Sequence, residues 1–253
     1  MVFSPHFDDE TLGCGGMILR KRLAGANVRI VFMTDGSRSH SHLMPADQLS
    51  AQRRNESLAA AEAMGVPPKS LDFLGFQETR LLKNADASYA VENLLLKHRP
   101  RQVFIPYRHD VNRDHETVNA IVCDCLARLR LEVEVFEYPI WFWNQWPWIH
   151  TGMPRARDLL WAACQACRSV LRAFNHFTLG LDIGHVLHLK MRALQCYQSQ
   201  MTRMLPTSDW KTLSDVANGR FLHTLLQRHE IFFRYPSKAL PTPDSKKAHA
   251  VLH

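Results

Sequence analysis

The stretch Ser4-Pro5-His6-Phe7-Asp8-Asp9-Glu10-Thr11-Leu12-Gly13-Cys14-Gly15-Gly16 packs one imidazole and three carboxylates into its third to seventh residues. Apolar Val2-Phe3 come before it, and an apolar pattern of helical spacing begins at Met17. This order predicts the end of a strand, a tight polar loop and the start of a helix. Such a junction is where α/β proteins gather their chemistry.

The polar residues of this stretch have two interpretations. His6 and a carboxylate three positions later can turn toward one ion, because imidazole nitrogen and carboxylate oxygen are both ligands of zinc. Alternatively, Asp8, Asp9 and Glu10 only complement the positive end of the following helix. The stretch by itself leaves both interpretations open.

Strand and helix patterns alternate along the rest of the chain. Further strands are predicted at 28–33, 71–74, 102–105 and 133–138, and helices at 50–64, 89–96, 116–129, 155–174 and 187–198. The alternation predicts a Rossmann-like α/β fold, in which helices cover both faces of a parallel sheet. Right-handed crossovers then place the loops at His6, Asp35 and 109–115 together at the C-terminal edge of the strands.

Length and composition indicate one globular domain. The chain has 253 residues, of which 46% are hydrophobic and 22% are charged, enough for a sizeable core. We predict a single domain over residues 1–235 and a disordered tail over 236–253, where prolines and lysines interrupt any core pattern. The polar segment 37–47, with His40 and His42, is expected to form a flexible surface loop.

Charge and targeting signals bear on the partners. The formal net charge is +7, but the basic residues are scattered without an aromatic-basic recognition pattern, so no nucleic-acid partner is expected. No apolar run approaches the roughly 18 residues needed to span a bilayer. Because no export signal is recognisable, a cytoplasmic location is expected. The pairs Cys164/Cys167 and Cys123/Cys125 lack a second pair at zinc-finger spacing and are expected to be buried thiols, and no oligomeric state is predicted.

The segment Trp141-Phe142-Trp143-Asn144-Gln145-Trp146-Pro147-Trp148 holds four of the six tryptophans. One interpretation is an apolar lid or patch that contacts a sugar, or a lipid in a peripheral membrane contact. The other is a loop packed onto the core. Both interpretations stay open at this point.

A second polar cluster, His109-Asp110-Val111-Asn112-Arg113-Asp114-His115, follows a predicted strand. A catalytic zinc typically takes three protein ligands and leaves one position for water. Two nitrogens and one oxygen for this purpose are offered by His6, Asp9 and His115. Asp8 is a neighbouring carboxylate that is placed to take a proton from the water.

The chain resembles the LmbE/PIG-L family of zinc-dependent de-N-acetylases. The family's opening motif, Pro-His-Pro-Asp-Asp-Glu with a later glycine pair, is present as residues 5–10 with Gly15-Gly16. Further matches are Thr34-Asp35-Gly36, Arg53-x-x-Glu56, Asp114-His115 and the segment 190–200. These motifs cover roughly residues 2–235 in the family's order, a combination that seldom arises by chance.

The resemblance implies a metal-dependent amidohydrolase that removes the acetyl group from an N-acetylated amino sugar of the N-acetylglucosamine type. It implies Zn²⁺, with Fe²⁺ as an alternative, bound by His6, Asp9 and His115. Asp8 would be the general base and Arg53 a sugar contact. Lipid-linked sugars, polysaccharide precursors, antibiotics and thiol glycosides are all candidate substrates.

The sequence departs from the family pattern at several positions. Phe7 replaces a proline, and Asn112-Arg113 replaces the His-Pro that often precedes Asp-His. Because that histidine is thought to stabilise the oxyanion, we expect Asn112 or His109 to donate the hydrogen bond instead. Asp114 is expected to orient a ligand imidazole. The first strand is expected to be short, since only Met1 to Phe3 precede the opening stretch that begins at Ser4.

The main alternative is a non-catalytic α/β module that binds a sugar or a nucleotide. A nucleotide site needs a phosphate cradle, but Gly13-x-Gly15-Gly16 lacks the dinucleotide spacing and follows carboxylates that repel phosphate. A third class is a membrane-surface or nucleic-acid-binding protein driven by its charge, for which steep salt dependence of binding would be diagnostic.

Overall fold

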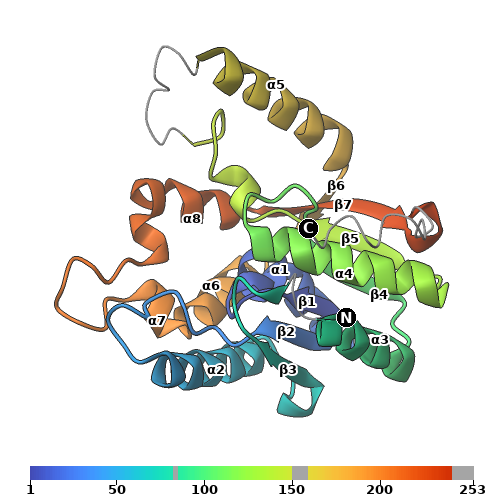
Figure 1. Cartoon of the computed structure of the whole chain (residues 1–253), viewed down its shortest axis with the longest axis horizontal. Coiled ribbons are helices and arrows are strands. Elements are labelled where there is room, and N and C mark those ends of the chain that lie inside the picture. The colour runs from blue at the N-terminus through green and yellow to red at the C-terminus, as the bar shows by residue number, and fades with distance from the viewer. Residues whose placement is uncertain (82–84, 150–158, 241–253) are drawn as a thin grey trace.

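The structure, a computed structural model, describes residues 1–81, 85–149 and 159–240 (Figure 1). At its centre is a seven-stranded sheet of order β3-β2-β1-β4-β5-β7-β6. The strands are β1 (Val2–Ser4), β2 (Ile30–Thr34), β3 (Leu71–Phe76), β4 (Gln102–Pro106), β5 (Glu134–Tyr138), β6 (Leu179–Asp182) and β7 (His229–Pro236). The first five run parallel, which confirms the predicted α/β class.

Helices cover both faces of the sheet, because each strand sends alternate side chains to opposite sides. The helices are α1 (Asp9–Leu23), α2 (Ala46–Ala63), α3 (Ala85–His98), α4 (Arg113–Leu129), α5 (Leu159–His176), α6 (Leu187–Gln195), α7 (Gln198–Met201) and α8 (Arg220–Leu225). In β2, Ile30 and Phe32 join a buried cluster with α1, α2 and α6. Val31 and Met33 join a second cluster with α3 and α4.

The last two strands add an antiparallel edge to the predicted parallel sheet. β7 pairs antiparallel with both β5 and β6, so the sheet is mixed at one edge. Their sequences lack a continuous apolar run, since Glu230 and Arg234 interrupt β7 and Gly180 interrupts β6. Open α/β sheets often carry such an antiparallel edge, which hydrophobic periodicity does not reveal.

The chain stays ordered beyond residue 235, where a disordered tail was predicted. Pro236 ends β7, and Ser237 opens the short 3₁₀ turn η6 (Ser237–Ala239). The Ser237 hydroxyl accepts from the Val133 N–H at 3.0 Å, and the Ser237 N–H donates to the Val133 carbonyl at 2.8 Å. The rest of the predicted tail, 241–253, lies outside the described residues.

Helix α1 begins at Asp9, inside the stretch predicted to be a loop. Gly13 and Gly16 therefore lie within the helix, where they permit close packing. A Cβ at Gly13 would lie 2.3 Å from the Tyr138 ring, and a Cβ at Gly16 would lie 2.5 Å from the Ile183 side chain. The glycines let α1 approach β5 and the residue that follows β6.

The strand order places a switch point between β1 and β4. From β1 the chain moves outward to β2 and β3, and it returns on the other side of β1 to form β4 and β5. Loops that leave the carboxyl ends of β1 and β4 diverge there, and open α/β sheets bind ligands in the resulting crevice. The two polar clusters of the sequence follow these two strands.

The tryptophan-rich segment 141–148 packs inward. It begins with the 3₁₀ turn η3 (Trp141–Trp143), in which Phe142 is fully buried. Trp143 contacts Trp148 edge-on, with 5.3 Å between the ring centroids, and Trp141 stacks on Phe221. Part of the segment therefore packs onto the core, whereas Trp146 is exposed, and the structure gives no support to a membrane contact through this segment. No helix in the described ranges is long and apolar enough to cross a membrane.

Candidate metal centre

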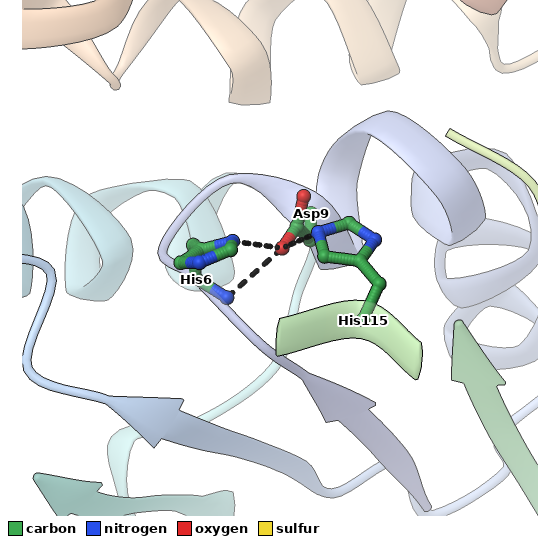
Figure 2. A group of neighbouring side chains, drawn as sticks. All are labelled: His6, Asp9 and His115. Atoms are coloured by element: carbon green, nitrogen blue, oxygen red, sulfur yellow. Dashed lines mark hydrogen bonds and ion pairs between the residues drawn. The ribbon is translucent and has the colours of Figure 1, made fainter. Parts of the chain in front are cut away.

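Three side chains converge at the switch point. His6 follows β1, Asp9 opens α1 and His115 lies in the first turn of α4, which begins three residues earlier than predicted. Figure 2 shows the three pointing toward one another, and their candidate ligand atoms all lie within 4.8 Å. Asp9 Oδ2 lies 3.0 Å from His6 Nδ1 and 3.1 Å from His115 Nε2.

The donor set and its electrostatics fit a divalent cation. His115 is fully buried, and its Nε2 lies close to Asp9 Oδ2 without hydrogen-bonding geometry, so a buried candidate ligand nitrogen has no hydrogen-bond partner. Burial disfavours charge on both imidazoles, but hydrogen bonds to Asp114 and Asp9 raise the pKa of His6 to about 10. Likewise, Asp9 and Asp110 raise the pKa of His115 to about 9. The site therefore attracts positive charge, and two nitrogens with one oxygen are a common zinc set.

In each of these imidazoles, the ring nitrogen that does not face Asp9 contacts a second carboxylate. His6 Nε2 lies 3.3 Å from Asp114 Oδ2, a contact compatible with the orienting role expected of Asp114. His115 Nδ1 lies 2.8 Å from Asp110 Oδ2, a contact that sequence reasoning missed. Such contacts set the tautomer and the ring direction of a ligand histidine. The only sequence signal for Asp110 was its membership of the second polar cluster.

Asp8 lies beside the triad but contributes no atom to it. Its backbone has φ of 111°, an unfavourable conformation for a residue with a side chain. Burial raises the pKa of Asp8 well above its usual range, and the guanidinium of Arg53, 3.7 Å away, opposes this shift. Backbone strain and a perturbed carboxyl pKa both cluster at functional sites.

Arg53, predicted to contact the sugar, is itself buried. Its Nη2 donates to the Phe7 carbonyl at 2.5 Å and its Nη1 to the Gly36 carbonyl at 3.3 Å, which ties together the loops after β1 and β2. Glu78, which follows β3 and was not predicted, lies 3.7 Å from Nη1. Arg53 Nε and Glu78 Oε1 are buried without hydrogen-bond partners, and both residues border a cavity.

The cavity beside the triad has a volume of about 310 Å³, at the lower end of the range for small-molecule sites. Seventeen residues line it. They include His6, Asp8 and Asp9. Of the two candidates for oxyanion stabilisation, only one is among them. Asn112 borders the cavity, and its Oδ1 caps α4 by accepting from the Asp114 N–H at 2.9 Å. His109 does not border it and instead contacts Tyr107 edge-on.

Most of the segment 37–47 is exposed, as expected of a surface loop, but Ser39, His40 and His42 also line the cavity. His40 is buried and stacks on Trp210, with 4.2 Å between the ring centroids. Its Nε2 lies 2.8 Å from the Lys211 carbonyl, so the loop is fastened to the segment before η5 (Leu213–Gly219). His42 is exposed at the cavity border. Neither histidine belongs to the triad, and Asp35 does not border the cavity.

The fold and the triad together define a Rossmann-like α/β protein with a candidate metal centre at the carboxyl ends of its parallel strands. Residues 1–126 match the family model for GlcNAc-PI de-N-acetylase, PIG-L. The chain belongs to this PIG-L (LmbE-like) family, as its motifs suggested.

Known relatives are similar over parts or all of the chain. The diacetylchitobiose deacetylase of Thermococcus kodakarensis is 29% identical over 107 residues, which are 42% of this chain and 39% of the relative. The match therefore spans less than half of that protein's length.

Two solved structures share the fold. N,N'-diacetylchitobiose deacetylase from Pyrococcus horikoshii has a TM-score of 0.65 at 20% identity, covering 97% of this chain and 86% of its own. GalB, the 4-carboxy-2-hydroxymuconate hydratase from Pseudomonas putida, has a TM-score of 0.58 at 18% identity, covering 96% and 97%. Because these two enzymes are named for different reactions, the shared fold does not by itself specify the chemistry.

Proposed function

We propose that this protein is a zinc-dependent hydrolase that removes the acetyl group from an N-acetylated amino sugar of the N-acetylglucosamine type. The observation that carries the proposal is the triad of half-buried His6 with buried Asp9 and His115, and the separate buried carboxyl of Asp8 beside it. Three ligands and one uncoordinated carboxylate are what metal-assisted amide hydrolysis requires. Family membership and the deacetylase relatives support the same reaction.

When bound by the triad, Zn²⁺ polarises the acetamide carbonyl and lowers the pKa of a bound water to about 7. Asp8 takes the proton that the attacking water loses and delivers it to the nitrogen of the departing amine. A carboxyl group with a raised pKa suits this double role, because it can hold the proton between the two transfers. Free amine and acetate are the products.

Asn112 is proposed to stabilise the oxyanion, the negatively charged oxygen that forms when water adds to the acetyl carbonyl group. With its Oδ1 engaged as the cap of α4, its amide N–H groups are the ones free to donate into the cavity. His109, the other candidate from the sequence, lacks access to the cavity.

Arg53 and Glu78 are proposed to bind hydroxyl groups of the sugar. Arg53 Nε and Glu78 Oε1 have no hydrogen-bond partner, although Oε1 lies 3.7 Å from Arg53 Nη1, so they offer one donor and one acceptor, the complement of a hydroxyl group. The remaining contacts of the Arg53 guanidinium hold the loop that carries Asp8.

Acetate release tests the proposal. The purified full-length chain, with zinc content measured by elemental analysis, is incubated with N,N'-diacetylchitobiose and other N-acetylglucosamine conjugates. We expect one zinc per chain and acetate release that chelation abolishes. The Asp8→Asn variant should keep its zinc and lose about 10²- to 10⁴-fold in kcat. Sugar binding without acetate release by the wild type would instead support a non-catalytic binding module.

A further inference from the structure

An apolar group and a polar group are among the side chains that line the cavity. Leu12, Trp141, Leu213 and Val216 all belong to one hydrophobic cluster. Ser39 and Gln200 belong to a polar group, in which Gln200 Nε2 donates to the Ser39 hydroxyl at 3.2 Å. A ligand with both an apolar face and a hydroxylated rim matches this lining.

One face of the Trp141 indole is covered by Phe221. Its ring stacks on Phe221 with a centroid distance of 4.6 Å and an interplanar angle of 18°. Phe221 is fully buried and does not border the cavity, so it covers the side of the indole that faces the interior. Trp141 itself is half-buried and borders the cavity, so part of its indole is accessible from there.

The position of Trp141 is coupled to the metal centre through Asp110. Asp110 Oδ1 accepts from the N–H of Phe142, the next residue along the chain, while Oδ2 contacts His115 Nδ1. The same buried carboxylate therefore fixes a proposed metal ligand and the turn that carries the indole. A ring stacked on Trp141 would be held at a defined position relative to the triad.

We propose that the indole of Trp141 is the platform on which the pyranose ring of the substrate stacks, which makes Trp141 a specificity-determining residue. A pyranose has a face of C–H groups and a rim of hydroxyls, and a fixed indole matches that face at little cost in conformational entropy. Acyclic N-acetylated amines lack such a face. This inference rests on the proposed function and adds that the enzyme selects cyclic amino sugars over acyclic acetamides.

The test compares two tryptophans of the same turn. Trp141→Ala and Trp141→Phe remove or reduce the platform, whereas Trp143→Ala changes a ring that packs on Trp148 and Phe177 and does not border the cavity. For N,N'-diacetylchitobiose, we expect Trp141→Ala to raise KM about tenfold and Trp141→Phe to raise it less. The kcat/KM for N-acetylethanolamine should stay within about twofold in both, and Trp143→Ala should leave the ratio of the two substrates unchanged.

A binding measurement separates this inference from the proposed function. Calorimetric titration of N,N'-diacetylchitobiose into the zinc-loaded Asp8→Asn chain needs no turnover. Binding that weakens with Trp141→Ala but not with Trp143→Ala supports the platform even if the wild type releases no acetate. Equal affinity in all three proteins, or an equal loss of kcat/KM for the cyclic and the acyclic substrate, would overturn it.

Discussion

Asp110 and His115 form a fully buried pair in which Asp110 Oδ2 lies 2.8 Å from His115 Nδ1. A proton on Nδ1 shared with this carboxylate leaves the lone pair of Nε2 directed at Asp9 and the centre of the triad. The pair therefore fixes which nitrogen of His115 can bind a metal, although Asp110 lies outside the triad itself.

Asp110→Asn should weaken zinc affinity by about 10- to 100-fold, because an amide oxygen supports the ligand tautomer less strongly than a carboxylate does. Competition with a chromogenic chelator measures the affinity. The matched control is Asp47→Asn, which changes an exposed carboxyl group in the first turn of α2. An unchanged affinity in Asp110→Asn would show that the pair does not tune the metal site.

Asn112→Ser should lower kcat by about 10²- to 10³-fold with little effect on stability. Serine is also a good N-cap, so α4 keeps its cap while the amide donor to the oxyanion is lost. His109→Ala should leave kcat within about twofold, since His109 does not border the cavity. Steady-state acetate release checks both variants, and near-normal kcat in Asn112→Ser would remove Asn112 from the mechanism.

Acidification should destabilise the protein partly through His109. Burial, with Arg172 and Arg108 nearby, lowers the pKa of His109 to about 4, from about 6.5 in an unfolded chain. Between these values the unfolded state binds the proton and the folded state does not, so stability falls as the pH falls from about 6.5 to 4. Urea denaturation at pH 7 and pH 4.5 should show a smaller loss in His109→Gln than in the wild type. Equal losses would contradict the assignment.

Gly16→Ala should destabilise the fold by about 1–3 kcal/mol, because the new methyl group would lie 2.5 Å from the Ile183 side chain. The control is Gly180→Ala in β6, where a Cβ meets nothing within 4 Å and φ is not positive. Urea denaturation gives the free energy of unfolding of each variant. A stable Gly16→Ala would mean that α1 and the residue after β6 separate easily.

The sequence by itself determined the parallel half of the sheet and the edge at which the polar clusters meet. Apolar runs such as the one at β2 are local signals, and the handedness of crossovers converts their order into a three-dimensional arrangement. The same reasoning selected His6, Asp9 and His115 before any contact between them was visible.

Only the tertiary structure determined which other residues contribute to the site at that edge of the sheet. Glu78 and Asp110 carry no distinctive local pattern, and their roles arise because the chain brings Arg53 and His115 against them from distant segments. The strands β6 and β7 and the placement of Trp141 over Phe221 depend in the same way on long-range packing. Periodicity reports how each segment meets the core, whereas a site is built from the ends of several segments, whose mutual approach no single segment encodes.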